Sequence, residues 1–310
     1  MEIPVTFKSE ENQLYGMVHI PEPGKQPKKA GVIFLPSGVK YRVGPHRLYV
    51  KLARQLQAQG YPCLRVDTHG IGDSEGELER GAITNVWSQI ETGRFVDDTL
   101  AAIAFFCREY ELDEVVLSGL CGGANTSLLA ATGDRRVSHL ILLGLSTLVS
   151  QPLETFSDQL NPGIATVIFS MYLKKIFNLK YWFRLLTFQS DYRLLFKSIS
   201  MSLLKRKNTK SEADKNLTRE TDNRFNKALV DSIHQFMTSK KNILFIMSEH
   251  DPALWNFTHL IQKPYLESDS RVDRDYEVAV ISSANHMLFL PEWQAACSDK
   301  MTSWLNARYP

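Results

Sequence analysis

Three residues, Cys121, Asp251 and His286, have the types and the chain order that nucleophilic catalysis needs. Cys121 is the centre of GLCGG (residues 119–123), which follows a short apolar segment and precedes a helix-forming one. Glycines on either side let a strand and a helix approach closely around a strained central residue. The positive end of a helix would also favour the thiolate form of Cys121. The alternative is a small buried cysteine before a glycine-rich helix start.

Two serines compete with Cys121 as nucleophile. Ser74 is the centre of a formal G-x-S-x-G pattern at residues 72–76, but no apolar helix is expected directly behind it, so the strand, turn and helix context is missing. Ser118 lies inside a predicted strand. The sequence therefore favours Cys121.

The acid and the base are expected on loops that follow two later strands. Asp251 lies in SEHDP after the apolar segment 243–247, and His286 lies in SSANH after 276–281. His286 would take the thiol proton and later protonate the leaving group, while Asp251 would fix its tautomer. Glu249 is the rival acid. His250 is the rival base, although it adjoins Asp251 too closely for an easy relay, and a loop role for His286 is the other alternative.

A developing oxyanion needs backbone N–H donors aimed at it. Gly122, directly after the nucleophile, would supply one donor. The second is expected from LPSGV (residues 35–39), at Val39 or Gly38. The same loop continues through Tyr41 and Arg42, which we predict to bind substrate, although a solvated loop explains these two residues equally well.

Short apolar segments alternate with helical patterns along most of the chain. An opening hairpin is predicted at 3–8 and 13–20, with buried strands at 31–35, 62–66, 115–119, 137–143, 243–247 and 276–281. Helices are predicted at about 46–59, 95–110, 124–132 and 292–307. This alternation predicts an α/β fold with a mostly parallel, doubly wound sheet.

The alternation fails at residues 146–240, which we interpret as an inserted, basic helical cap (lid) domain. The core domain would then comprise residues 1–145 and 241–310. Residues 161–210 contain ten lysines and arginines but one acid, Asp191. The basic segment 172–188 could lie on an anionic membrane, and a solvated cap helix is the plainer interpretation.

Composition excludes several classes of protein. The formal net charge of +2 gives no argument for a nucleic-acid partner. Four cysteines without a CxxC pair are too few to stabilise 310 residues by disulfide bonds, which suggests a reducing cytoplasm. No signal peptide and no membrane-spanning run are evident. Histidine spacing indicates no metal site, and no dinucleotide fingerprint occurs, so no cofactor is expected. The oligomeric state is left open.

The motifs together resemble the α/β-hydrolase superfamily: LPSG, DTHGIGDS (67–74), GLCGG, SEHDP and ANH span nearly all of the chain outside the cap. More narrowly, GVKYRVGPHRLYVKLAR with GDSEG and GLCGGAN is similar to hydrolases associated with exosortase and exopolysaccharide systems. The G-x-C-x-G-G form resembles dienelactone hydrolases, which implies that a cysteine nucleophile is compatible with the fold. The basic cap and DTHG depart from the usual pattern.

A thiolate that attacks a thioester forms another thioester, so this exchange is nearly thermoneutral, whereas attack on an ordinary ester runs uphill. The leading hypothesis is a thioesterase, acyltransferase or cyclase that forms an acyl-cysteine on a hydrophobic acyl substrate. An acidic acyl-carrier protein could dock on the basic cap. The alternatives are an ester or lactone hydrolase, an eliminase or isomerase, and a non-catalytic protein that binds a carrier protein or a membrane surface.

Overall fold

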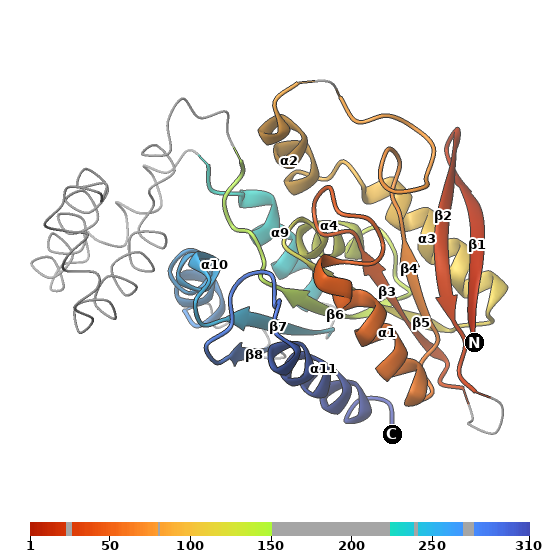
Figure 1. Cartoon of the computed structure of the whole chain (residues 1–310). Coiled ribbons are helices and arrows are strands. Elements are labelled where there is room, and N and C mark those ends of the chain that lie inside the picture. Colours follow the sequence, from red (N-terminus) through yellow and green to blue (C-terminus); the bar gives the residue numbers. More distant parts are fainter. Residues whose placement is uncertain (23–26, 80, 151–223, 239–240, 269–275) are drawn as a thin grey trace, which may run out of the picture.

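The described residues form one eight-stranded sheet with the order β1-β2-β4-β3-β5-β6-β7-β8, which carries the loops of interest (Figure 1). The computed structural model describes residues 1–310 except 23–26, 80, 151–223, 239–240 and 269–275. The hairpin β1 (Glu2–Ser9) and β2 (Asn12–His19) is antiparallel and joins the sheet through an antiparallel pairing of β2 with β4 (Cys63–Val66). Both strands of the hairpin were predicted from the sequence.

The other strands pair in parallel. They are β3 (Ala30–Leu35), β5 (Glu114–Leu120), β6 (Val137–Leu143), β7 (Asn242–Ser248) and β8 (Tyr276–Ile281). Each lies within one or two residues of its predicted range. Because their carboxyl ends meet at one edge of the sheet, the loops after β3, β5, β7 and β8 are brought together there.

Helices cover both faces of the sheet, which confirms the doubly wound prediction. One face carries α1 (Leu48–Ala58) and α11 (Pro291–Asn306), which contact each other. The opposite face carries α3 (Val96–Glu109), α4 (Gly122–Ala131) and α9 (Lys227–Met237), whose apolar side chains share one core with the sheet. In β3 every residue is buried, as expected of a strand covered on both sides.

Three helical elements of the described residues were not expected from the sequence. They are the helices α2 (Ile83–Glu91) and α10 (Pro252–Phe257) and the π-helical η3 (Thr258–Leu266). A short 3₁₀ turn, η1 (Pro45–Arg47), precedes α1. Helix α9 lies within the range assigned to the cap, yet Leu229, Ile233 and Phe236 are buried against the core. Most of the predicted cap, including Asp191 and the segment 172–188, lies outside the described residues.

Among the described residues, no helix is long and apolar enough to cross a membrane.

Candidate active site

Cys121 lies on the sharp turn between β5 and α4, in a backbone conformation that side chains rarely adopt. Its φ and ψ are 57° and −119°. The turn is held because the Cys121 N–H donates to the Leu143 carbonyl at 2.9 Å, while the Cys121 carbonyl accepts from Ala124 at 2.9 Å and Asn125 at 3.1 Å. Strain that is held by its surroundings in this way is typical of functional sites.

Glycines make this turn possible, as the sequence predicted. A Cβ placed on Gly119 would lie 2.4 Å from the carbonyl carbon of Gly123. A Cβ on Gly123 would lie 2.6 Å from the backbone oxygens of Leu35 and Pro36. Such contacts are too short for any real Cβ, and backbone atoms cannot move aside cheaply. Helix α4 therefore begins against both β5 and the loop after β3 only because these two positions lack side chains.

Gly123→Ala is accordingly expected to lower the free energy of unfolding by about 1–3 kcal/mol or more, because the helix must move away from the β3 loop. Denaturant unfolding of the purified variants measures this change. Gly133→Ala is the matched control: its Cβ would meet chiefly the flexible Leu100 side chain, at 3.3 Å. Equal unfolding midpoints for the two variants would contradict this account of the turn.

Cys121 also differs from the other cysteines in its exposure. Cys63, Cys107 and Cys297 are buried, whereas Cys121 is partly exposed. Burial raises the pKa of all three buried thiols, that of Cys297 to about 12. These three cysteines are therefore poor thiolate sources at neutral pH.

His286 contacts both Cys121 and Asp251. Its Nδ1 lies 2.5 Å from Oδ2 of Asp251. Burial alone would lower the pKa of His286, but the hydrogen bonds with Asp251 and with the Cys121 side chain outweigh burial and raise that pKa well above its ordinary value. The structure thus brings together the three residues that the sequence singled out, in the order nucleophile, base and acid.

Asp251 is fixed by the start of helix α10. Its Oδ1 accepts the backbone N–H of Ala253 at 2.9 Å and caps the helix, while Oδ2 faces His286. The side chain is 4% exposed, and Pro252 at the first helical position suits such a start. One carboxylate therefore caps a helix with one oxygen and orients the imidazole with the other.

The loops after β7 and β8 are tied to each other directly. The backbone N–H of His250 donates to the Ala284 carbonyl at 2.8 Å, and that of Glu249 donates to the Ile281 carbonyl at 3.1 Å. The Glu249 carboxylate accepts the Ser283 N–H at 2.6 Å. Glu249, the rival acid, thus binds the backbone of the loop that carries His286.

The competing serines are held in other arrangements. The Ser74 hydroxyl donates to the Asp67 carbonyl at 2.7 Å and accepts the Tyr15 N–H at 2.9 Å, so it ties its loop to β2. Ser74 is 8% exposed. Ser118 is fully buried within β5. The Ser118 hydroxyl has no hydrogen-bond partner among the described residues, and neither partner of the Ser74 hydroxyl is a histidine.

The expected oxyanion residues lie side by side. A Cβ on Gly122 would be 3.3 Å from both the Cα and the nitrogen of Gly38, so the turn after Cys121 faces the loop after β3. Gly38 has a φ of +60°, which favours glycine. Val39, the other expected donor, packs against the small cluster formed by Ile71, Val86, Ile90 and Phe95.

The two residues expected to bind substrate differ in their surroundings. Tyr41 is 50% exposed. The Arg42 guanidinium forms ion pairs with Asp67 and with Asp73, the second at 2.6 Å, and its backbone N–H donates to Asp67 at 2.5 Å. Arg42 therefore joins the β3 loop to the loop after β4, and its charge is already balanced by two carboxylates.

Tyr49 is a residue of the site that the sequence did not indicate. Its fully buried hydroxyl accepts the N–H of Leu120, the residue before Cys121, at 2.8 Å. Helix α1 thereby supports the end of β5 from the other face of the sheet. Since the two residues are 71 positions apart, no local pattern could have indicated this contact.

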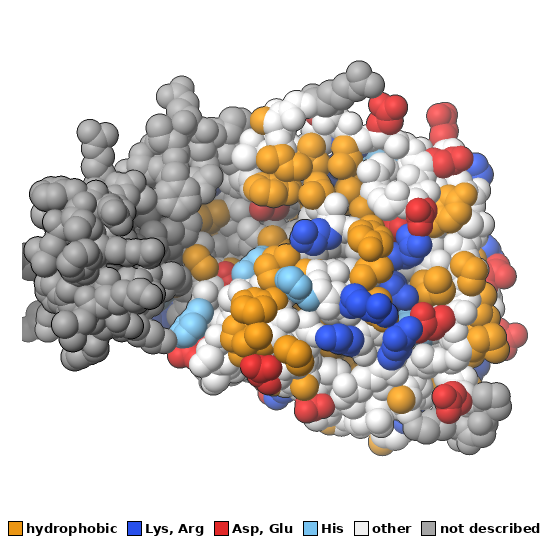
Figure 2. All heavy atoms as spheres, viewed as in Figure 1, with side chains coloured by type: hydrophobic (Ala, Val, Ile, Leu, Met, Phe, Trp, Pro, Cys, Tyr) orange, Lys and Arg blue, Asp and Glu red, His pale blue; other side chains and the backbone are white. Residues whose placement is uncertain are grey.

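Apolar side chains lie exposed near the site. Ile83 and Trp87 on α2 are 47% and 41% exposed, and Phe289, three residues after His286, is 45% exposed. Trp87 borders the oxyanion loop, because its Nε1 would be 3.8 Å from a Cβ on Gly38. Figure 2 shows hydrophobic side chains gathered over α2 and again near the start of α11.

No group of three or more histidine, cysteine or acidic side chains gathers as a metal site in the part of the chain that the structure describes.

Residues 28–291 match the family model described as serine aminopeptidase, S33. The chain belongs to this hydrolase family. Its sheet and helices are those of the α/β-hydrolase fold. The S33 description names a serine, whereas the residue at the β5–α4 turn of this chain is Cys121. A search of curated proteins found no match.

Solved structures share the fold at low sequence identity. An esterase from Pyrococcus furiosus, Pf2001, is 14% identical with a TM-score of 0.56, over 98% of this chain and 92% of the esterase. The α/β hydrolase GrgF from Penicillium sp. sh18 is 17% identical with a TM-score of 0.57, over 100% and 99%. XC6422 from Xanthomonas campestris, a serine hydrolase without a lid, is 14% identical with a TM-score of 0.52, over 98% and 94%.

Proposed function

We propose that this S33-family chain is an acyl-transfer enzyme that forms an acyl-cysteine at Cys121, acting as a thioesterase, acyltransferase or cyclase on a hydrophobic acyl thioester. The observation that carries the proposal is the contact of His286 with both Cys121 and Asp251 at the β5–α4 turn. A cysteine at the N-terminus of α4, paired with an imidazole that an aspartate orients, is an activated nucleophile.

The reaction would proceed in two steps. His286 takes the thiol proton of Cys121, the sulfur attacks the thioester carbonyl, and Gly122 with Gly38 or Val39 donates to the oxyanion. As the carbon–sulfur bond of the substrate breaks, the leaving thiolate takes the proton held by His286. In the second step His286 accepts a proton from water or another acceptor, which attacks the acyl-cysteine, and the proton returns to the departing Cys121 sulfur.

The apolar side chains beside the site support a hydrophobic acyl group. Trp87 borders the oxyanion loop, and Ile83 on the same helix and Phe289, three residues after His286, also offer exposed apolar surface. Burying an acyl chain there would contribute binding energy in proportion to the apolar area removed from water. We also propose that the basic residues at 161–210 of the predicted cap form a docking site for an acidic carrier protein. These residues lie outside the described part of the chain.

Hydrolysis of oxygen esters is a second candidate, because the family model is named for a serine enzyme, an aminopeptidase, and a similar fold belongs to an esterase. A matched pair of substrates distinguishes the two. We expect kcat/KM for an acyl thioester to exceed that of the oxygen ester with the same acyl group by at least about 10-fold, corresponding to about 1.4 kcal/mol. An equal or reversed ratio in steady-state assays would favour the esterase.

A further inference from the structure

An arginine-rich pocket of 340 Å³ lies between the β1–β2–β4 edge of the sheet and α1. Arg42 and Arg47 come from the segment between β3 and α1, Arg54 from α1 and Arg65 from β4, and Glu2 is the acidic residue in the lining. Figure 2 shows lysine and arginine side chains gathered on this face of the molecule, over the N-terminal half of α1. The pocket is open to solvent on one side.

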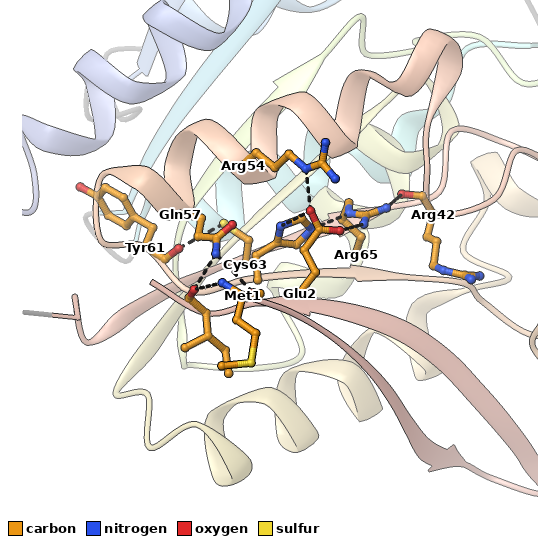
Figure 3. A network of polar contacts seen from close by, with 10 residues as sticks. Met1, Glu2, Arg42, Arg54, Gln57, Tyr61, Cys63 and Arg65 are labelled. Atoms are coloured by element: carbon orange, nitrogen blue, oxygen red, sulfur yellow. Dashed lines mark hydrogen bonds and ion pairs between the residues drawn. The ribbon is translucent and has the colours of Figure 1, made fainter. Parts of the chain in front are cut away.

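Arg65 is a buried cation that pairs with Glu2 (Figure 3). The side chain is 4% exposed. Its Nε donates to the Nε2 of His19 at 2.8 Å and one terminal nitrogen donates to the Arg42 carbonyl at 3.3 Å. Burial and the neighbouring Arg65 lower the pKa of His19 to about 4, so His19 is a neutral acceptor. The nearest carboxylate, Glu2, is 3.7 Å away.

Glu2 also pairs with Arg54, whose Nε lies 2.5 Å from the other carboxylate oxygen of Glu2. Arg42 is balanced by Asp67 and Asp73, but Arg47 is exposed and pairs with no carboxylate in the described parts of the chain. The four arginines of the pocket thus face three carboxylates, those of Glu2, Asp67 and Asp73, which leaves an excess of one positive charge. Burial lowers the pKa of Arg65; the carboxylates of Glu2 and Asp67 oppose this effect, whereas Arg42 and Arg54 add to it.

A bound anion would remove this imbalance. Guanidinium groups present several N–H donors in a planar fork, which matches the oxygens of a phosphate. Donors that converge from a strand, a helix and a loop can surround one phosphate from three sides. The Arg65 side chain is held in place because it is buried. The side chains of Arg47 and Arg54 are exposed and can turn toward a ligand.

The pocket is also within reach of Cys121. Gly38 contacts the turn after Cys121, and Arg42 is four residues further along the same loop, at most about 14 Å away along a fully extended chain. Two backbone turns, Lys40 N–H to Ser37 and Gly44 N–H to Tyr41, shorten this path. An extended substrate can therefore place its reacting carbonyl at Cys121 and an anionic group in the pocket.

We propose that this pocket binds the phosphate group of the substrate, specifically the phosphate of the phosphopantetheine arm on which an acyl thioester is carried. The identity of the ligand rests on the proposed thioester chemistry, whereas the anion site rests on the arginine cluster alone. Coenzyme A and a carrier protein present the same phosphopantetheine phosphate, so the pocket would recognise either.

Binding of non-acylated ligands tests the site without any turnover. By calorimetry we expect 4′-phosphopantetheine to bind the full chain at least about 10-fold more tightly than pantetheine, which lacks the phosphate. An Arg47→Gln/Arg54→Gln double variant should lose this difference, and Glu2→Gln, which removes the competing carboxylate, should increase it. Arg108→Gln is the matched control, because Arg108 is exposed on α3 and pairs with Glu109.

Equal affinities for the two ligands in the wild type, or an undiminished phosphate effect in the folded double variant, would overturn the proposal. The kinetic arm compares acyl-coenzyme A, acyl-carrier protein and acyl-pantetheine: a larger kcat/KM for one phosphorylated donor, lost in the double variant, identifies the source. Phosphate binding without any acylation of Cys121 would refute the proposed function alone. Acylation that is equally fast with and without the phosphate would refute this site alone.

Discussion

Cys121→Ala is expected to lower kcat/KM for an acyl thioester by roughly 10⁴-fold to 10⁶-fold, because the variant has no atom that can form the acyl-enzyme. The residual rate would come from the oxyanion donors and from substrate binding. Steady-state kinetics with a chromogenic thiol reagent measures the loss. The folded state should be little affected, since Cys121 is partly exposed and the Cβ is retained.

Two further variants make this prediction specific. Ser74→Ala removes the serine of the formal G-x-S-x-G pattern and should cost stability through its two hydrogen bonds while leaving the acylation step intact. Cys297→Ser changes a cysteine that is fully buried. If Ser74→Ala lost activity and Cys121→Ala retained it, Ser74 and not Cys121 would be the nucleophile.

Asp251→Asn should lower kcat by about 10⁴-fold while the start of α10 stays capped. Asparagine can still cap α10 through its amide oxygen, but its NH₂ group would then face Nδ1 of His286 and favour the wrong tautomer. Glu249→Gln is the control, because its amide oxygen can still accept the Ser283 N–H. Comparable losses in the two variants would indicate that the loop contact, and not the orientation of His286, determines activity.

The same substitution has a consequence for pH. Because the pKa of His286 is raised in the folded chain, its protonation stabilises the fold fully below about pH 6.5, and this contribution is lost as the pH rises through the folded pKa. Removing the carboxylate should move the imidazole titration to lower pH and flatten the dependence of stability in that window. Histidine NMR titration and denaturant unfolding measure the two effects; an unchanged His286 midpoint would contradict the assigned cause.

The local sequence predicted the sheet and the turn around Cys121 well. Strand β6 was predicted with its observed bounds, Val137–Leu143, because a short apolar run between breakers has few other interpretations. The glycines around Cys121 predicted a close strand–helix approach, which the Gly123 contact with Leu35 and Pro36 demonstrates. Chain order and strand context favoured Asp251 and His286 over the rivals Glu249 and His250, because parallel strands place successive loops at one edge, and the structure places the Asp251 carboxylate against His286.

Contacts between distant segments could not be predicted in this way. The support of Leu120 by Tyr49 depends on how α1 packs, and the charge balance of Arg42 depends on loops 25 residues apart. Helix α2 was missed although Ile83, Val86, Trp87 and Ile90 follow helical spacing, because the helix is only 9 residues long and its start at Ala82 has no side-chain cap. The arginine pocket likewise needs four elements of the fold at once, which no single motif encodes.

The most direct test of the account is the intact mass of the protein after rapid acid quenching during the first turnover of an acyl thioester. We predict a mass increase equal to the acyl group, located by peptide mapping on Cys121 and absent from Cys121→Ala. Product formation at the wild-type rate by Cys121→Ala, with no acyl adduct on Cys121 of the wild type at any quench time, would contradict the acyl-cysteine mechanism.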